Sequence, residues 1–103
     1  MGQRPEIVCI CGSMLFATEM RKESARLTLA GAIALAPGET SLAATEPMTA
    51  EQKAMLDALH RHKIDLAERV VVINPGGDVG DSTRDEIEYA RAAGKPVSFT
   101  DSD

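Results

Sequence analysis

The alternation of short apolar runs with longer amphipathic stretches constrains the fold of this chain more than any other feature. The apolar runs fall at residues 6–11, 33–36, 70–73 and 97–99, and stretches of helical periodicity separate them at 15–31, 49–67 and 82–93. Continuous apolar runs are typical of strands buried on both faces of a parallel sheet, in which each connection crosses over through a helix. We therefore predict an α/β protein, a flavodoxin- or Rossmann-like three-layer domain with four parallel strands in the order 2-1-3-4.

Local signals mark the ends of the expected helices. Thr49, with Gln52 three residues further on, predicts a capping box at the start of the second helix. Gly94 is the expected residue after the third helix, and Pro96 prevents that helix from continuing. Residues 38–48 are small or polar without periodicity and predict a loop. The 103 residues show no repeat and no linker, so we expect one domain over residues 1–103.

Charge and hydropathy exclude several classes of partner. The net charge of −5 leaves no basic face for a nucleic-acid polymer. No apolar run approaches the roughly 20 residues that a membrane span needs, and the N-terminus has no signal-peptide pattern. We therefore expect a cytoplasmic protein that binds neither a membrane nor a nucleic acid.

Cys9 and Cys11 lie two residues apart in the first apolar run. On a strand both side chains point to the same face, where we expect them to be small buried hydrophobic groups. A disulfide between them would strain the strand, and two thiols alone make a poor metal site. No metal and no cofactor is expected.

The predicted topology brings two glycine-bearing turns to one crevice. In sheets of this order, ligands bind beyond the carboxyl ends of strands 1 and 3, where the order of the strands reverses. The first of these strands ends at Gly12-Ser13-Met14, and the third ends at Asn74-Pro75-Gly76-Gly77. Gly12 permits close approach of a ligand, and Ser13 offers a hydroxyl to a phosphate or a sugar. The structural alternative is a tight turn with Ser13 as a helix N-cap.

The stretch from Pro75 to Glu86 contains several candidate functional residues. Ser82 and Thr83 present hydroxyl and N–H groups at the start of a helix, and Glu86 follows one turn later. A carboxylate beside an anion site suits the cleavage of N-glycosidic bonds, because it can stabilise or attack the oxocarbenium-like anomeric carbon. The alternative is a capping box formed by Thr83 and Glu86.

A polar cluster ends the second helix, at Asp57, His60, His62, Lys63 and Asp65. A solvated helix end explains most of these side chains, except for any that points into the crevice. Tyr89 lies on the third helix, where it either stacks on a base or packs against the protein.

Residues 67–97 and the turn after the first strand resemble the nucleoside 2-deoxyribosyltransferase-like superfamily, which includes small nucleoside 5′-monophosphate N-glycosidases. The resemblance rests on Cys11-Gly12-Ser13, the 67–72 run AERVVV, the 86–90 run EIEYA and the 94–97 run GKPV. It implies that Glu86 is the nucleophile and that Asp78 is the loop acid. The helix-borne acid of the family would be supplied by Asp65 or Asp57.

A second family shares the same kind of loop. Pro75-Gly76-Gly77, Gly80, Ser82-Thr83 and Glu86 resemble the motif of phosphoribohydrolases that release free cytokinins, with two additional residues in the spacing. Both families cleave the N-glycosidic bond of a nucleotide.

These observations predict a hydrolase or glycosyltransferase that acts on a nucleoside or a nucleoside 5′-monophosphate. The expected catalytic residues are Glu86, Asp78 and Asp65. The expected substrate-binding residues are Gly12, Ser13, Met14, Asn74, Gly76, Gly77, Ser82, Thr83 and Tyr89. The alternative is a nucleotide-binding sensor or adaptor on the same fold, without catalysis.

We also expect a homodimer or a multiple of one. No helix is predicted after the fourth strand, so three helices must cover two faces of a sheet. A partner would then hide apolar helix positions such as Phe16, Met20, Met55 or Leu59. The resembling family also self-associates.

Overall fold

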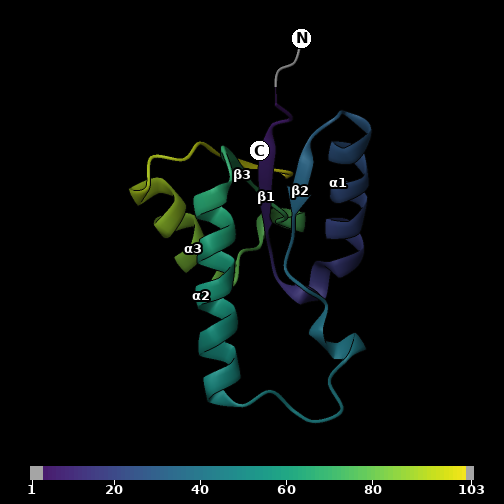
Figure 1. Cartoon of the computed structure of the whole chain (residues 1–103), viewed down its shortest axis with the longest axis vertical. Helices are drawn as coiled ribbons and strands as arrows, with labels where there is room; N and C mark the ends of the chain where they lie inside the picture. Colours follow the sequence, from purple (N-terminus) through teal and green to yellow (C-terminus); the bar gives the residue numbers. More distant parts are fainter. Residues whose placement is uncertain (1–3, 102–103) are drawn as a thin grey trace.

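The computed structural model describes residues 4–101 and has the predicted α/β architecture. All strand pairs of the four-stranded sheet are parallel, and the strand order is β2-β1-β3-β4. Figure 1 shows α1 on one face of the sheet and α2 and α3 on the other. The elements are β1 (Ile7–Cys11), α1 (Ala17–Leu29), β2 (Ile33–Leu35), α2 (Ala50–Leu66), β3 (Arg69–Val72), α3 (Asp81–Ala92) and β4 (Val97–Phe99). The predicted fold class and strand order are confirmed.

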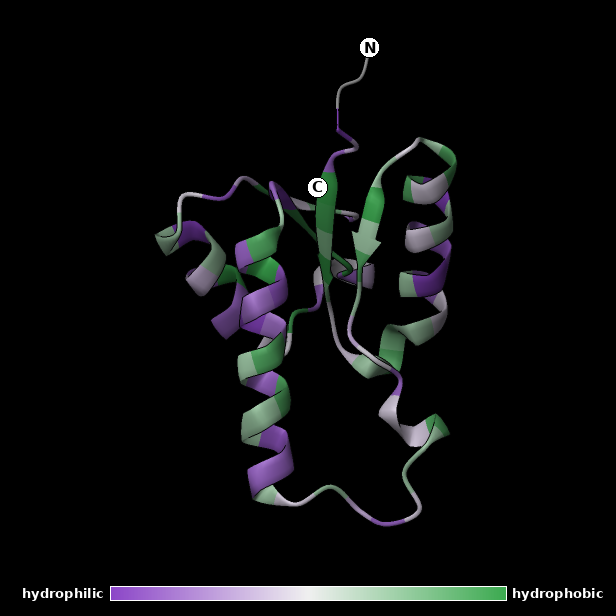
Figure 2. Cartoon of the chain, in the orientation of Figure 1, coloured by the Kyte–Doolittle hydropathy of each residue, from purple (hydrophilic) through white to green (hydrophobic). Residues whose placement is uncertain are grey.

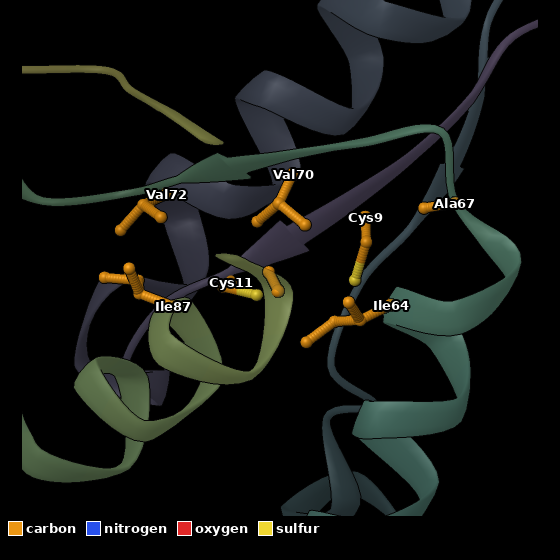
Figure 3. Close-up of a cluster of buried hydrophobic side chains, with 8 residues drawn as sticks. Cys9, Cys11, Ile64, Ala67, Val70, Val72 and Ile87 are labelled. Carbon is orange, nitrogen blue, oxygen red and sulfur yellow. The ribbon is translucent and has the colours of Figure 1, made fainter. Parts of the chain in front are cut away.

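The two faces of β1 contribute to two separate cores. Val8 and Ile10 pack with Met20 and Leu27 beneath α1. Cys9 and Cys11 point the other way and pack beneath α2 and α3 with a second set of residues, Ile64, Ala67, Val70, Val72, Ile87 and Ala90. Figure 3 shows the two cysteine side chains within this second cluster. The apolar run of β1 is therefore buried on both faces of the sheet. Figure 2 shows hydrophobic residues along this central strand.

The register places the ends of β1 and β3 side by side. Cys9 pairs with Val70 and Cys11 with Val72, and Ile73 donates its backbone N–H to the carbonyl of Cys11 at 2.8 Å. The chain after each strand therefore leaves the sheet at the same edge. This edge is the one at which ligands bind in such folds.

The predicted helix ends are largely confirmed. Thr49 caps α2 through the reciprocal capping box with Gln52. Gly94 adopts a φ of 77°, which only glycine enters freely. The 3₁₀ turns Met14–Phe16 and Thr40–Leu42 were not predicted, and α1 accordingly starts at Ala17 rather than Leu15. Among the described residues, no helix is both long enough and apolar enough to cross a membrane.

Candidate functional site

A cavity of about 420 Å³ opens beyond the carboxyl end of β1. Four segments form its wall: the turn after β1, the loop after β2, the middle of α2 and the start of α3. The lining residues are Gly12, Ser13, Met14, Pro37, Gly38, Thr40, Met48, Lys53, Leu56, Asp57, His60, Gly80, Asp81, Ser82, Thr83 and Glu86. Six residues expected to bind or act on a substrate therefore share one cavity: Gly12, Ser13, Met14, Ser82, Thr83 and Glu86.

The turn after β1 packs closely against the core at Gly12. A Cβ atom on Gly12 would lie 3.2 Å from Cβ of Ile73 and 3.3 Å from Sδ of Met20, both in the core beneath α1, so this position favours glycine. Ser13 caps the following 3₁₀ turn, because its Oγ accepts a hydrogen bond from the backbone N–H of Leu15 at 3.1 Å. The hydroxyl hydrogen of Ser13 is still available to a ligand.

The start of α3 offers backbone donors to the cavity. Its N-cap is Gly80, and no side chain caps this end of the helix. The first N–H groups of a helix have no intrahelical partners, and they attract anions together with the helix dipole. Ser82 and Thr83 lie in this first turn, so the arrangement can hold a phosphate or a sugar hydroxyl. Thr83 is buried inside α3 and is not its N-cap, so the alternative of a capping box between Thr83 and Glu86 is wrong.

Glu86 presents a largely buried carboxyl group to the cavity. Its side chain is 18% exposed, and Oε1 lies 3.7 Å from Nε2 of His60. Burial raises the pKa of Glu86 above its ordinary value, although the neighbouring His60 acts in the opposite direction. The charge of Asp57 also raises the pKa of Glu86, which places a second carboxylate in the electrostatic surroundings of the first.

His60 connects this carboxyl group with the two cysteines. Its Nε2 atom lies 3.3 Å from Sγ of Cys11 and 3.7 Å from Sγ of Cys9, whereas its buried Nδ1 has no hydrogen-bond partner among the described residues. Burial alone would lower the pKa of His60, but the hydrogen bond with Cys9 and the charge of Glu86 together raise it.

The two thiols have different proton affinities. The pKa of the Cys9 thiol is lowered to about 6, because a hydrogen bond with Cys11 and the adjacent His60 stabilise its thiolate against the effect of burial. The same hydrogen bond, together with burial and the charge of Cys9, raises the pKa of Cys11. The pKa values of the two thiols are therefore shifted in opposite directions beneath His60.

Charged residues of α2 complete the wall. Lys53 lies 3.2 Å from the carboxylate of Asp57, one helical turn away, and both line the cavity. A small adjoining hollow of about 50 Å³ lies among Asp57, Arg61, Ser82, Asp85 and Glu86.

The turn after β3 does not line this cavity, contrary to our expectation for Asn74, Gly76 and Gly77. Asn74 is buried and binds the chain after β4, donating from Nδ2 to the carbonyl of Asp101 at 3.1 Å. The backbone N–H of Gly76 donates to Oδ2 of Asp101 at 2.7 Å. These hydrogen bonds hold the turn toward the β4 side of the sheet.

Three other expected residues also lie outside the lining of the cavity. Asp78 is exposed between the 3₁₀ turn Pro75–Gly77 and α3. The hydroxyl of Tyr89 donates to Oδ1 of Asp65 at 2.7 Å, so these two side chains bridge α2 and α3. The roles that we assigned to Asp78, Asp65 and Tyr89 receive no support from their positions.

Our predicted site residues omitted ten of the lining residues, among them His60 and Asp57, whose charges act on Glu86. A usable signal exists in the sequence, because His60 precedes the buried Ile64 by one helical turn and must share its face. Asp57 lies three residues before His60 and extends the same face toward the cavity.

Comparisons with known proteins show the class of fold. The structure is similar to that of a 2-deoxyribosyltransferase from the psychrotolerant bacterium Bacillus psychrosaccharolyticus, with a TM-score of 0.71. The match covers 90% of this chain and 70% of the other, at 19% sequence identity. No protein-family model matches the sequence, and a search of curated proteins also finds no match. The similarity to the transferase is therefore one of fold.

Proposed function

We propose that this chain cleaves the N-glycosidic bond of a nucleoside or a nucleoside 5′-monophosphate, either by hydrolysis or by transfer of the sugar. The observation that carries the proposal is the largely buried carboxyl group of Glu86, which faces a cavity also lined by the uncapped start of α3. The fold shared with a 2-deoxyribosyltransferase supports the same class of reaction.

In the proposed reaction a carboxylate oxygen of Glu86 forms a bond to the anomeric carbon as the bond to the base nitrogen breaks. The electron pair of the broken bond leaves with the base, which takes up a proton from solvent. Water or a second base then displaces Glu86 from the sugar. Of the two acids on α2 that we considered, Asp57 would assist Glu86 rather than Asp65, because Asp57 lines the cavity and acts electrostatically on Glu86.

The remaining lining residues would hold the substrate. Ser13, Ser82 and the first N–H groups of α3 would bind the 5′ end, whether a hydroxyl or a phosphate. Met14 and Met48 would contact the base, since they provide apolar surface in the same cavity.

Incubation with pooled nucleosides and 5′-monophosphates, with free base measured by chromatography, tests the proposal. We expect Glu86→Gln to reduce base release by at least about 100-fold, because the amide can neither attack the sugar nor balance its positive charge. The matched control is Glu88→Gln, which changes an exposed carboxyl group on the same helix and should leave turnover unchanged.

A non-catalytic nucleotide sensor predicts a different outcome. The wild-type chain would then bind a nucleotide in a calorimetric titration but release no base from any member of the pool. Equal turnover by the wild type and Glu86→Gln would instead remove Glu86 from the mechanism.

A further inference from the structure

Cys9, Cys11 and His60 converge on one another beneath the cavity, in an arrangement that the proposed reaction does not use. The two Sγ atoms and Nε2 of His60 all lie within 4.8 Å of one another. All three residues are buried, with 0% of each cysteine and 6% of His60 exposed. Figure 3 shows both cysteine side chains on the same side of β1. Strand β1 and helix α2 therefore bring together a pair of cysteines and a histidine that lies 51 and 49 residues from them in the sequence.

The two distances between nitrogen and sulfur match those of a tetrahedral metal centre. Zinc binds thiolate sulfur at about 2.3 Å and imidazole nitrogen at about 2.0–2.1 Å, so the two kinds of ligand atom lie roughly 3.5 Å apart around one ion. The observed distances from Nε2 to the two Sγ atoms, 3.3 Å and 3.7 Å, fall on either side of this value.

A candidate fourth ligand approaches from the cavity side, outside the group of three ligand atoms that lie within 4.8 Å of one another. Oε1 of Glu86 lies 3.7 Å from the same Nε2 atom of His60. Two thiols, one imidazole and one carboxylate form a donor set that favours Zn²⁺ over Mg²⁺ or Ca²⁺, which prefer oxygen ligands alone. Glu86 and His60 both line the cavity, so an ion has an entry path from solvent.

We infer that Cys9, Cys11 and His60 form a zinc-binding site, with Glu86 as the fourth ligand. A pair of ordinary core thiols is the competing explanation, and our expectation for the sequence followed it because His60 was not yet placed beside them. Both cysteines bind zinc as thiolates, so binding of the metal releases the protons of the thiols to solvent, and no change of oxidation state is involved. The proposal does not rest on the proposed function, since it concerns metal binding alone.

Titration of the full-length, reduced chain with Zn²⁺ and with Co²⁺ tests this site. We expect one equivalent of zinc to remain bound after gel filtration, as measured by elemental analysis. Co²⁺ should give the charge-transfer absorption of thiolate ligands and the intense visible bands of a tetrahedral complex. Chelation of the metal should lower the melting temperature of the chain.

Variants identify the ligands. Cys9→Ser, Cys11→Ser and His60→Asn should each weaken zinc binding by more than about 100-fold. Loss of a residue that only hydrogen-bonds to a ligand weakens metal binding by up to about 100-fold, and loss of a ligand itself should cost more. Glu86→Gln should weaken it less, because three ligands remain. The matched control is His62→Gln on the same helix, whose side chain is 76% exposed and which should bind zinc like the wild type.

If a buried substitution prevents folding, the cobalt spectrum of the wild type still tests whether the cysteines bind the metal. A spectrum without thiolate charge transfer overturns the proposal, as does zinc bound with equal affinity by His60→Asn and His62→Gln. Base release is a separate assay, so failure of the zinc site and failure of the glycosidase proposal give different results.

Discussion

Glu86 has a different role in each of the two proposals, as a nucleophile in one and as a zinc ligand in the other. As a free carboxylate it faces the cavity and can attack a sugar, whereas as a zinc ligand it would turn toward His60, whose Nε2 lies 3.7 Å away. A carboxylate oxygen that is bound to zinc is a poor nucleophile, because its lone pair and charge are already engaged. The two proposals therefore exclude each other within one molecule at one time.

This exclusion predicts that zinc inhibits the reaction. Under the proposed function, one equivalent of Zn²⁺ should slow base release by the wild-type chain at least about 10-fold, and a chelator should restore the rate. The measurement is the ratio of rates with and without zinc, taken for each protein separately. In Cys9→Ser that ratio should approach one. Acceleration by zinc would show instead that the ion takes part in the chemistry.

Gly12 gives a second prediction at the scale of a single residue. A methyl group in Gly12→Ala would lie 3.2 Å from the Ile73 side chain and 3.3 Å from its carbonyl oxygen. We expect a loss of about 1–3 kcal/mol in the free energy of unfolding, as is usual for overpacked sites. Urea denaturation measures this loss. Gly38→Ala serves as the control, since its methyl group meets no atom within 4 Å and should change stability by less than about 0.5 kcal/mol.

Helix α2 is the element on which the candidate site depends most, because it supplies Asp57 and His60 to the cavity. Its start is fixed by the capping box of Thr49 and Gln52, at 3.0 Å and 2.9 Å. Thr49→Ala should cost about 1 kcal/mol and speed amide exchange in the first turn of α2, measured by urea denaturation and NMR. Thr45→Ala, in the exposed loop before the helix, should change neither quantity.

The elements were predictable from the sequence because their signals are local. The periodicity of apolar residues marks the helices and strands, and capping residues mark the helix ends. The right-handedness of crossover connections then leaves few possible orders for four parallel strands. The same reasoning brought Ser13, Ser82 and Glu86 to one edge of the sheet, where they line one cavity. It could not place Asn74 and Gly76, since their direction depends on hydrogen bonds to Asp101 that form only after β4 has joined the sheet.

The contact of His60 with Cys9 and Cys11 also could not be predicted from local sequence patterns. Spacing shows that Cys9 and Cys11 share a face of their strand, and Ile64 shows which face of the helix is buried. Neither pattern fixes how far α2 slides along β1, and this offset decides whether His60 meets the two sulfurs. A contact between distant elements is set by packing of the whole layer.

At the scale of the whole molecule, the structure changes which helix should meet a partner. Met20 is buried and Phe16 packs beneath α1, so the expectation that these side chains need a partner is wrong. Helix α2 instead exposes Met55, Leu59 and Leu66, which follow one stripe at spacings of four and seven residues. Figure 1 shows that the first half of α2 extends beyond the sheet.

We therefore predict a homodimer that forms through this stripe of α2 and buries on the order of 1,200 Å² or more in total. Sedimentation at micromolar concentration should show twice the 11.0 kDa mass of the chain. The double change Met55→Asp with Leu59→Asp should convert the dimer to a monomer, because two carboxylates cannot be buried unpaired in an apolar contact. Leu29→Asp, at a 91% exposed position on α1, should leave the dimer intact. A wild-type monomer would show that no such dimer forms. Equal dissociation by both sets of variants would show that the contact does not depend on this stripe of α2.

The stripe also lies beside the cavity, because Leu56 and Asp57 of α2 line the cavity. Loss of the dimer should therefore also weaken nucleotide binding.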